Sequence, residues 1–402
     1  MMKLLIINNN TIEKIGRDYY SVYSWIRFPQ YLAFHCERVT MWVPGIIHET
    51  GMKPPQDYWR VEGNLHIEFY DYLESFSEYY RLWPRRALAW RRQAEQLIEE
   101  HDVIVLRVPS PMISVITKSA RRKNKPLVVI ISGNVQTQSD RIIANYVIKR
   151  FFYRILAKLL IYKEIACVRQ ATIVYAYSSE LTKRHQKNNS RIKRMQTPHI
   201  SKNDFIYRID TCQSPEIRLL RVCWLLPSKG LEYLLESMLL LLERGLPVWL
   251  EIVGKGRSHR YREKLVSYAE QLGIAERIQF MGWIPFNKIQ KIYTRSDIQI
   301  ISSLAEGTPR NIIEGAARGL PLVSTRVGGC ADVLIHEQNA ILVSPGRPRA
   351  MADAIERIIK DGPLRRKLIK HGYEMALNGT FEQLGMKFLD DISDICKFDK
   401  SL

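Results

Sequence analysis

The chain has 402 residues, which is enough for two domains of ordinary size, and 46% of them are hydrophobic, so a largely disordered protein is excluded. Its net charge of +19 indicates an anionic partner, for which nucleic acid, anionic lipid and phosphorylated small molecules are the candidates. The six cysteines are scattered without a C-x-x-C pair, which disfavours a zinc site or a disulfide framework and is typical of a reducing cytoplasm.

Strand-like and helix-like segments alternate along the first half, which is typical of an α/β domain with a parallel sheet. The apolar run of the first strand stops at Asn8, too early for the core of a signal peptide. No apolar run of the sequence approaches the ~20 residues needed to span a bilayer. The clearest helical patterns are 85–100 and 142–165. Strands are predicted at 3–7, 39–43, 66–69, 103–106, 127–131 and 173–177.

A polar and basic segment at 188–210, with Pro198 inside it, predicts the domain boundary. We expect one domain at 1–205 and a second at 206–380. The second half alternates in a doubly wound order, in which ligands bind beyond the carboxyl ends of the strands. Its strands are predicted at 219–225, 248–253, 278–281, 298–301, 322–324 and 341–343. Its helices are predicted at 231–243, 261–272, 287–294, 311–318, 350–360, 363–376 and 381–395.

The loop after the fourth strand of the second half carries two glutamates eight residues apart, Glu306 and Glu314. Gly307 frees the backbone at the strand end, and Pro309 suits the helix start because its missing N–H needs no partner there. The free amides around Arg310 would form an anion site, and the two carboxylates could accept hydrogen bonds from sugar hydroxyls. An isolated pair of this spacing is more often two solvated helix-end charges, so the flanking pattern decides for a site.

The segment from about Leu219 to Asn378 resembles the donor domain of the retaining GT-B glycosyltransferases of the group 1 type (family 4). The resemblance covers roughly 40% of the chain, and the first half resembles the family's acceptor domain only in strand order. It implies two Rossmann-like doubly wound domains facing a central cleft, with a helix at 381–402 packing back towards the N-terminal domain. The matching pieces, in family order, are LLPSKGLEYLLES, LEIVGKG, RIQFMGWIP, IYTRSDIQIISSLAEGTPRNIIEGAARGLPLVSTRVGG and NAILVSPGRP.

The resemblance also implies a donor site, residue by residue. Glu314 would bind the ribose hydroxyls, Glu306 would lie against the donor sugar, and Lys229 would bind the diphosphate. The backbone of Ile284 would contact the base. The backbone amides that would hold the sugar and the diphosphate are those of Gly307, Thr308 and Arg310.

The chemistry that the resemblance implies needs no metal ion and no cofactor besides the nucleotide-diphosphate sugar, which is a co-substrate. Cations stabilise the departing nucleoside diphosphate, and Lys229 with the helix N-terminus would supply part of that charge. Retention would follow from front-face attack by the acceptor hydroxyl, with the leaving phosphate as the base.

The sequence departs from the family pattern at the first strand of the donor domain. Where the family has G-R-L before K-G, the chain reads Cys223-Trp224-Leu225, and an indole N–H cannot replace the bidentate contact of a guanidinium with phosphate. Trp224 would then lie beside Lys229 at the diphosphate, and Trp224→Arg is expected to raise turnover. Arg221 is the candidate substitute for the missing arginine, but it lies an odd number of residues away, so we expect it to face the other side of the strand. In the first half, a glycine-rich first loop is missing, and 132–134 reads Ser-Gly-Asn where the family often has a histidine.

Positive charge concentrates between Lys149 and Lys202. A basic amphipathic helix there would dock on an anionic membrane surface, or its apolar face would pack in the domain core. Because no recognised nucleic-acid motif accompanies the charge, the sequence disfavours nucleic acid as the partner. The basic positions of this helix are Lys149, Arg150, Arg154, Lys158 and Lys163.

The resemblance implies a metal-independent retaining glycosyltransferase that moves a sugar from a nucleotide-diphosphate sugar to a hydroxyl of a glycan or lipid-linked acceptor. We expect it in polysaccharide or glycolipid biosynthesis for the cell envelope, in the cytoplasm or peripherally on the cytoplasmic face of the membrane. The alternative, motivated by Trp224, is a catalytically weak homologue that binds a nucleotide sugar or a partner protein. The sequence leaves the base, the donor sugar, the acceptor and the linkage open.

Overall fold

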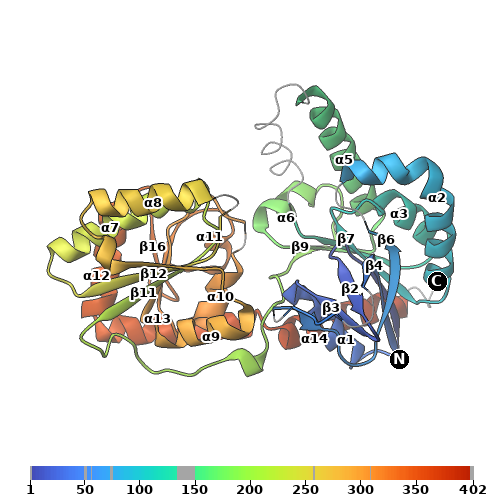
Figure 1. The fold of residues 1–402 in the computed structure, drawn as a ribbon. Helices are drawn as coiled ribbons and strands as arrows, with labels where there is room; N and C mark the ends of the chain where they lie inside the picture. The colour runs from blue at the N-terminus through green and yellow to red at the C-terminus, as the bar shows by residue number, and fades with distance from the viewer. Residues whose placement is uncertain are drawn as a thin grey trace. The chain divides into compact units, whose positions relative to one another are not determined.

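The computed structural model describes residues 2–48, 52–55, 57–72, 76–133, 150–256, 259–307 and 309–398. The chain forms two compact units, one made of the residues up to His199 together with those from Leu384 onward, the other of Ile200–Gln383. Each unit is built around its own sheet, with helices packed on both faces (Figure 1).

The N-terminal unit contains a sheet of order β10-β9-β8-β7-β1-β4-β2-β3-β5, with β6 paired to β4. The pairings are parallel except for β2 with β3 and β3 with β5. Strand LVVII is apolar throughout, and KLLII is apolar after Lys3, because helices cover both faces of a parallel sheet. The strands are β1 (Lys3–Ile7), β2 (Ile12–Ile15), β3 (Asp18–Ser21), β4 (Arg38–His48), β5 (Trp59–Arg60), β6 (Leu65–Asp71), β7 (Val103–Val108), β8 (Leu127–Ile131), β9 (Ile173–Ala176) and β10 (Ile192–Arg194).

The helices of this unit are α1 (Arg27–Ala33), α2 (Phe76–Glu99), α3 (Ile113–Arg122), α5 (Arg150–Gln170) and α6 (Ser179–His185), with a 3-10 turn at Ser24–Ile26. All six predicted strands are present, whereas β2, β3, β5 and β10 were not predicted, because each is short and contains charged residues, unlike the equally short but apolar β9. Helix α3 was also missed, since its sequence ISVITKSARR begins with β-branched residues, which favour strands.

The C-terminal unit contains a parallel sheet of order β13-β12-β11-β14-β15-β16. Helices α7, α8 and α12 cover one face of it, and α9 and α10 cover the other (Figure 1). The strand order reverses between β11 and β14, which is where a doubly wound sheet opens a crevice for ligands. The strands are β11 (Ile217–Val222), β12 (Val248–Val253), β13 (Ile278–Gly282), β14 (Ile298–Ile301), β15 (Leu322–Thr325) and β16 (Ile341–Val343).

The helices of the C-terminal unit agree closely with the sequence pattern, and α7, β12, β14 and β16 have the predicted bounds. Strand β11 does not, because it ends at Val222 and not at residue 225. The helices are α7 (Leu231–Glu243), α8 (His259–Gln271), α9 (Phe286–Arg295), α10 (Arg310–Ala316), α11 (Cys330–Val333), α12 (Pro348–Lys360), α13 (Gly362–Leu377) and α14 (Phe381–Phe398), of which the last continues into the N-terminal unit.

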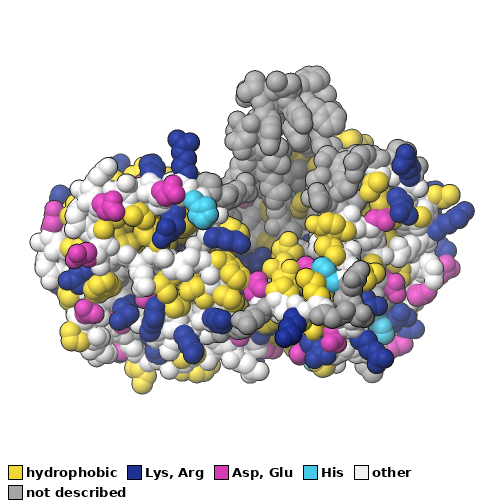
Figure 2. All heavy atoms as spheres, in the orientation of Figure 1, with side chains coloured by type: hydrophobic (Ala, Val, Ile, Leu, Met, Phe, Trp, Pro, Cys, Tyr) yellow, Lys and Arg dark blue, Asp and Glu magenta, His cyan; other side chains and the backbone are white. Residues whose placement is uncertain are grey.

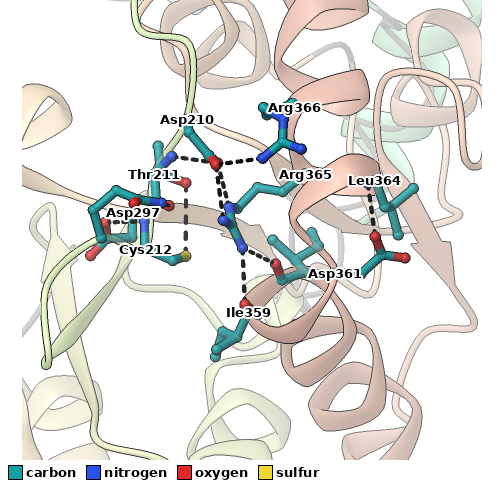
Figure 3. A network of polar contacts seen from close by, with 11 residues as sticks. Asp210, Thr211, Cys212, Asp297, Ile359, Asp361, Leu364, Arg365 and Arg366 are labelled. Atoms are coloured by element: carbon teal, nitrogen blue, oxygen red, sulfur yellow. Dashed lines mark hydrogen bonds and ion pairs between the residues drawn. The ribbon is translucent and has the colours of Figure 1, made fainter.

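A buried arginine binds the segment that leads into β11 (Figure 3). Arg365 on α13 is 5% exposed and donates to the carboxylate of Asp210 from Nε at 2.6 Å and from Nη2 at 3.1 Å. Asp297 accepts hydrogen bonds from the backbone N–H groups of Cys212 and Arg218, each at 2.8 Å. This network lies at the amino ends of β11 and β14, so it stabilises the sheet without occupying its carboxyl edge.

Helix α14 completes the core of the N-terminal unit. The ring of Phe388, which is 1% exposed, lies with its centroid 5.7 Å from that of Phe28 and 5.2 Å from that of Tyr175. The hydroxyl of Tyr175 donates to Asp391 at 2.6 Å, and Lys193 pairs with the same carboxylate at 2.6 Å. The last helix of the sequence is therefore an integral part of the first unit.

The basic helix predicted at 142–165 corresponds in part to α5. Lys149 lies outside the described residues, as do the side chains of Arg150 and Arg154. In the described part, Lys158 is exposed, and Leu159 and Tyr162 are 42% and 71% exposed. Lysine and arginine side chains are also spread over both units on the face drawn in Figure 2.

All six cysteines are free. Within the described ranges, no helix has both the length and the apolarity required to cross a bilayer. The same residues contain no cluster of three or more His, Cys, Asp or Glu side chains that could hold a metal ion.

Candidate functional site

The turn between β11 and α7 brings Lys229 to the end of β14. Lys229 closes a 3-10 turn, and Gly230 follows it with φ 60°, a left-handed conformation that favours glycine. A Cβ on Gly230 would lie 2.3 Å from the carbonyl oxygen of Ser302, so no other residue fits this approach. The hydroxyl of Ser302 in turn donates to the carbonyl of Lys229 at 2.8 Å. The two loops beyond β11 and β14 are thus tied together at the carboxyl edge of the sheet.

Glu306 stands at the centre of a buried charge cluster in this loop pair. Its Oε2 lies 2.7 Å from Nζ of Lys229, and its Oε1 accepts a hydrogen bond from the hydroxyl of Ser303 at 2.7 Å. Nη2 of Arg221 donates to the same hydroxyl at 2.7 Å and lies 3.8 Å from Oε1 of Glu306. The side chains are 16% exposed for Lys229, 9% for Glu306 and 0% for Arg221. The cluster therefore holds two cations and one carboxylate within a largely dry site.

The expectation that Arg221 faces away from this site is wrong. Strand β11 ends at Val222, so the alternation of side chains does not extend to Trp224 and gives no relation between the two residues. Arg221 shares a face of β11 with Leu219, which packs in the core beneath α7. From there its guanidinium reaches the loop after β14. From the sequence, Arg221 was only a dismissed substitute for the missing cation, and Ser303, which lies in the motif that carries Glu306, was not singled out.

Trp224 belongs to a stack of two tryptophans and a lysine. Nζ of Lys255 lies 5.9 Å from the ring centroid of Trp224 and 5.6 Å from that of Trp283. The indoles are 52% and 46% exposed, and the three residues follow the neighbouring strands β11, β12 and β13. Ile284, next to Trp283, is half-buried and packs against the core beneath α9. A contact of Trp224 with a diphosphate stays a prediction.

Glu314 lies on α10 and is oriented by Tyr293 of α9. The tyrosine hydroxyl donates to Oε2 of Glu314 at 2.8 Å. The ring of Tyr293 is fully buried, and this burial, followed by the neighbouring Glu314 carboxylate, raises the pKa of its hydroxyl well above the usual value. Arg318, also fully buried, donates to the carbonyl of Glu314 at 2.7 Å. The sequence did not single out Tyr293, because an aromatic residue on the apolar face of a helix reads as core.

The remaining predicted residues lie around the start of α10. Gly307 and Arg310 are exposed, and Thr308 lies outside the described residues. The helix begins at Arg310, preceded by Pro309 in an extended conformation. The side-chain amide of Asn311 donates to the carbonyl of Val222, which ties α10 to the end of β11. The structure thus brings Lys229 and Glu306 into contact and attaches the helix of Glu314 to the same edge of the sheet.

Comparison with known proteins shows which family the C-terminal unit resembles. Residues 212–375 match the family model described as glycosyl transferases group 1. An uncharacterized glycosyltransferase of Methanocaldococcus jannaschii, MJ1607, is 32% identical over 159 residues, which are 40% of each chain. The D-inositol 3-phosphate glycosyltransferase of Corynebacterium diphtheriae is 27% identical over 42% of this chain and 41% of its own. The lipopolysaccharide core biosynthesis glycosyltransferase LpsE of Rhizobium meliloti is 32% identical over 39% of this chain and 43% of its own. The chain thus spans less than half the length of these relatives.

Solved structures extend the similarity of fold to almost the whole chain. The Anabaena protein HepE, solved in complex with UDP and glucose, has a TM-score of 0.69 and 15% identity, and the match covers 98% of this chain and 100% of that one. WaaG, a glycosyltransferase involved in lipopolysaccharide biosynthesis, has a TM-score of 0.63 and 15% identity over 97% of this chain and 99% of its own. The predicted GT-B fold class is therefore confirmed.

Proposed function

Because residues 212–375 form a group 1 glycosyltransferase domain within a GT-B fold, we propose that this protein transfers a sugar from a nucleoside-diphosphate sugar to a hydroxyl acceptor. The observation that supports the proposal most is the contact of Lys229 with Glu306, with Arg221 beside the same carboxylate. These residues lie at the edge where a doubly wound sheet binds its ligand. We further propose that the reaction proceeds with retention of the anomeric configuration and belongs to family 4.

The proposed roles follow from charge and position. Lys229 exchanges Glu306 for the diphosphate of the donor and stabilises the charge that develops on the leaving group, without a metal ion or an added cofactor. Glu306 lies against the donor sugar, and Glu314, held by Tyr293, binds the ribose hydroxyls. The residues that contact the rest of the donor are Gly307, Thr308 and Arg310 at the sugar and diphosphate, Ile284 at the base, and Trp224 beside it.

The proposed acceptor is a hydroxyl of a glycan or of a lipid-linked sugar in the assembly of envelope polysaccharide or glycolipid, on the cytoplasmic side of the membrane. The name of the relative from Rhizobium meliloti, a lipopolysaccharide core biosynthesis glycosyltransferase, supports this class. Exposed Lys158, Leu159 and Tyr162 on α5 offer a surface for peripheral contact with anionic lipid. Cosedimentation with anionic vesicles at low salt tests that contact, and protein left entirely in the supernatant would remove it.

A donor screen tests the proposal directly. Thermal unfolding is measured with UDP-, GDP- and ADP-sugars, and a true donor at 100 times its dissociation constant adds about 2.7 kcal/mol of stability. Glu314→Ala should then weaken nucleotide binding by roughly 1.5–3 kcal/mol, the value of a hydrogen bond to a charged group. Lys229→Ala should lower turnover, whereas Lys264→Ala, which removes a lysine paired with Glu232 on the surface, should not. The absence of stabilisation by every nucleotide sugar would overturn the proposal.

The alternative of a catalytically weak homologue predicts a different combination of results. It requires tight donor binding with only trace transfer or hydrolysis, because a leaving-group cation would be missing at Trp224. Arg221 bears on this alternative, since it adds a second cation to the cluster around Glu306. Turnover numbers for the donor that the screen identifies separate the two functions.

A further inference from the structure

We propose that Arg221 is a positioning residue that acts through Ser303 to hold Glu306 in place and balance its charge while Lys229 is engaged with the diphosphate. The inference rests on the proposed function and adds to it a residue outside the motifs that define the family resemblance. It assigns Arg221 no contact with substrate.

The donors and acceptors of the hydrogen bonds define a relay that runs from Arg221 through the hydroxyl of Ser303 to Glu306. A guanidinium only donates, so the contact of 2.7 Å between Nη2 of Arg221 and the hydroxyl of Ser303 uses an oxygen lone pair of the serine. The single proton of that hydroxyl is left for Oε1 of Glu306, 2.7 Å away. Ser303 is fully buried, so it does not exchange this proton contact for one with bulk water. Arg221 therefore fixes the hydroxyl, and the hydroxyl fixes the carboxylate.

The two cations beside Glu306 differ in their freedom to move. Lys229 ends in a compact ammonium on a flexible stem and contacts Oε2 from a partly open position. Arg221 is fully buried and also lies 3.4 Å from the carbonyl of Ile300, so it stays where it is. When a diphosphate draws Lys229 away, Glu306 would be left as a nearly buried carboxylate without a cation, which is strongly unfavourable. Because the positive charge of Arg221 lies beside the other carboxylate oxygen, Oε1, Glu306 keeps one neighbouring cation when Lys229 leaves.

The incomplete bonding of Arg221 supports a role in function over one in stability. Its Nε is buried and has no hydrogen-bond partner among the described residues. A buried guanidinium that leaves a donor unpaired lowers the stability of the fold relative to an apolar side chain of similar size. Such a residue is expected where its charge serves the site.

Kinetics and binding together test the inference on the full-length protein, with the donor and the nucleoside diphosphate that the screen identifies. Arg221→Met and Ser303→Ala should each lower kcat, Arg221→Met by roughly 10- to 100-fold, less than the 10²–10³ typical of a direct electrostatic contact. The Kd of the nucleoside diphosphate should stay within about threefold in Ser303→Ala, which keeps both cations, and should rise in Arg221→Met, because Lys229 then leaves Glu306 without a cation when it binds the diphosphate. Arg221→Lys, which keeps the charge, should recover part of kcat. Ser237→Ala removes a buried serine hydroxyl of α7 and should leave kcat unchanged.

The double variant tests whether Arg221 and Ser303 act on Glu306 through the same chain of hydrogen bonds. Arg221→Met with Ser303→Ala should be no slower than Arg221→Met alone, since both changes interrupt the same relay. Additive losses in kcat would overturn the inference, as would an unchanged nucleotide Kd in Arg221→Met. If Arg221→Met does not fold, an unchanged kcat in Ser303→Ala overturns it alone. A wild-type protein that binds no nucleotide sugar instead contradicts the proposed function, before any variant is made.

Discussion

Trp224 and Arg221 lie at the end of the same strand but in opposite surroundings. Arg221 is buried beside Glu306, whereas Trp224 is half exposed and shares Lys255 with Trp283. A guanidinium placed at residue 224 would meet the ammonium of Lys255, and like charges at that distance repel. We therefore expect the chemistry of the proposed site to depend more on the buried arginine than on the residue that departs from the family pattern.

The stack changes what we expect from Trp224→Arg. On the sequence alone, this substitution restores a missing cation and raises turnover. With Arg221 beside Glu306 and Lys255 against residue 224, we expect kcat to change by less than tenfold, which corresponds to about 1.4 kcal/mol in the barrier. Steady-state kinetics with the identified donor measure the change. An increase of tenfold or more would show that residue 224 reaches the leaving group.

Tyr293 provides a second test at the scale of a single residue. Tyr293→Phe removes the hydroxyl that donates to Glu314 and keeps the buried ring, so Glu314 loses its orientation. Nucleotide affinity should fall by about tenfold, within the 0.5–1.5 kcal/mol of an ordinary hydrogen bond. Titration calorimetry of wild type and variant measures it. The matched control is Tyr268→Phe, which removes a hydroxyl bonded to Glu236 at 2.8 Å on the helices α7 and α8 and should leave affinity unchanged. Equal affinities in all three proteins would contradict the role of Tyr293.

At the scale of elements, helix α7 has a left-handed glycine at each end. Gly230 precedes the helix with φ 60°, and Gly245 follows it with φ 76°. A Cβ on Gly245 would meet no atom within 4 Å, whereas one on Gly230 would meet the carbonyl of Ser302. An alanine would be strained by the left-handed backbone at both positions, but it would meet another atom only at Gly230. Comparing the two substitutions therefore separates the cost of the conformation from the cost of the close contact.

This difference predicts unequal effects of alanine at the two ends. Gly245→Ala should cost about 1–2 kcal/mol of unfolding free energy, the value of a side chain in the left-handed region. Gly230→Ala should cost more and should also lower turnover, because the loop of Lys229 must move away from Ser302 and Glu306. Denaturant unfolding and donor kinetics measure the two effects. If the variants were equally stable and equally active, the loop contact would have no part in the site.

At the scale of the whole molecule, the chain passes between its two units twice. The last helix returns to the N-terminal unit and buries Phe388 and Ile392, which are 1% and 0% exposed. The N-terminal unit therefore cannot form its full core until the end of the chain is available. The C-terminal unit, by contrast, is a continuous segment from Ile200 to Gln383.

Substitutions on α14 should accordingly destabilise one unit and spare the other. Phe388→Ala should cost about 3–5 kcal/mol, as is usual for a buried phenylalanine. Met386→Ala, on the exposed side of the same helix, should stay within about 0.5 kcal/mol. Hydrogen exchange resolved by peptide measures where protection is lost, which we expect in β9 and α1 and not in the sheet of β11 to β16. Equal loss in both units would mean that they unfold together.

The sequence by itself determined the elements of the C-terminal unit and the identity of Lys229, Glu306 and Glu314 as its candidate residues. Both rest on local information, because hydrophobic periodicity gives the type of an element and a motif keeps its residues within one loop or helix. The alternation of strands and helices also determined the α/β class, and the resemblance of the second half to the group 1 glycosyltransferases implied the GT-B architecture. The errors of the sequence-based prediction in the first half fell on short strands that contain charged residues, which show no apolar run, and on helix α3, whose β-branched residues favour strands.

Only the tertiary structure decided which side chains meet at the site. Arg221 and Ser303 are 82 residues apart, and Tyr293 and Glu314 belong to different helices, so no local pattern relates them. The end of β11 at Val222, opposite the end of β12 at Val253, is likewise a property of the paired strands. A residue's side of a strand follows from its sequence only as far as the strand extends, and that length is decided by the neighbouring strand.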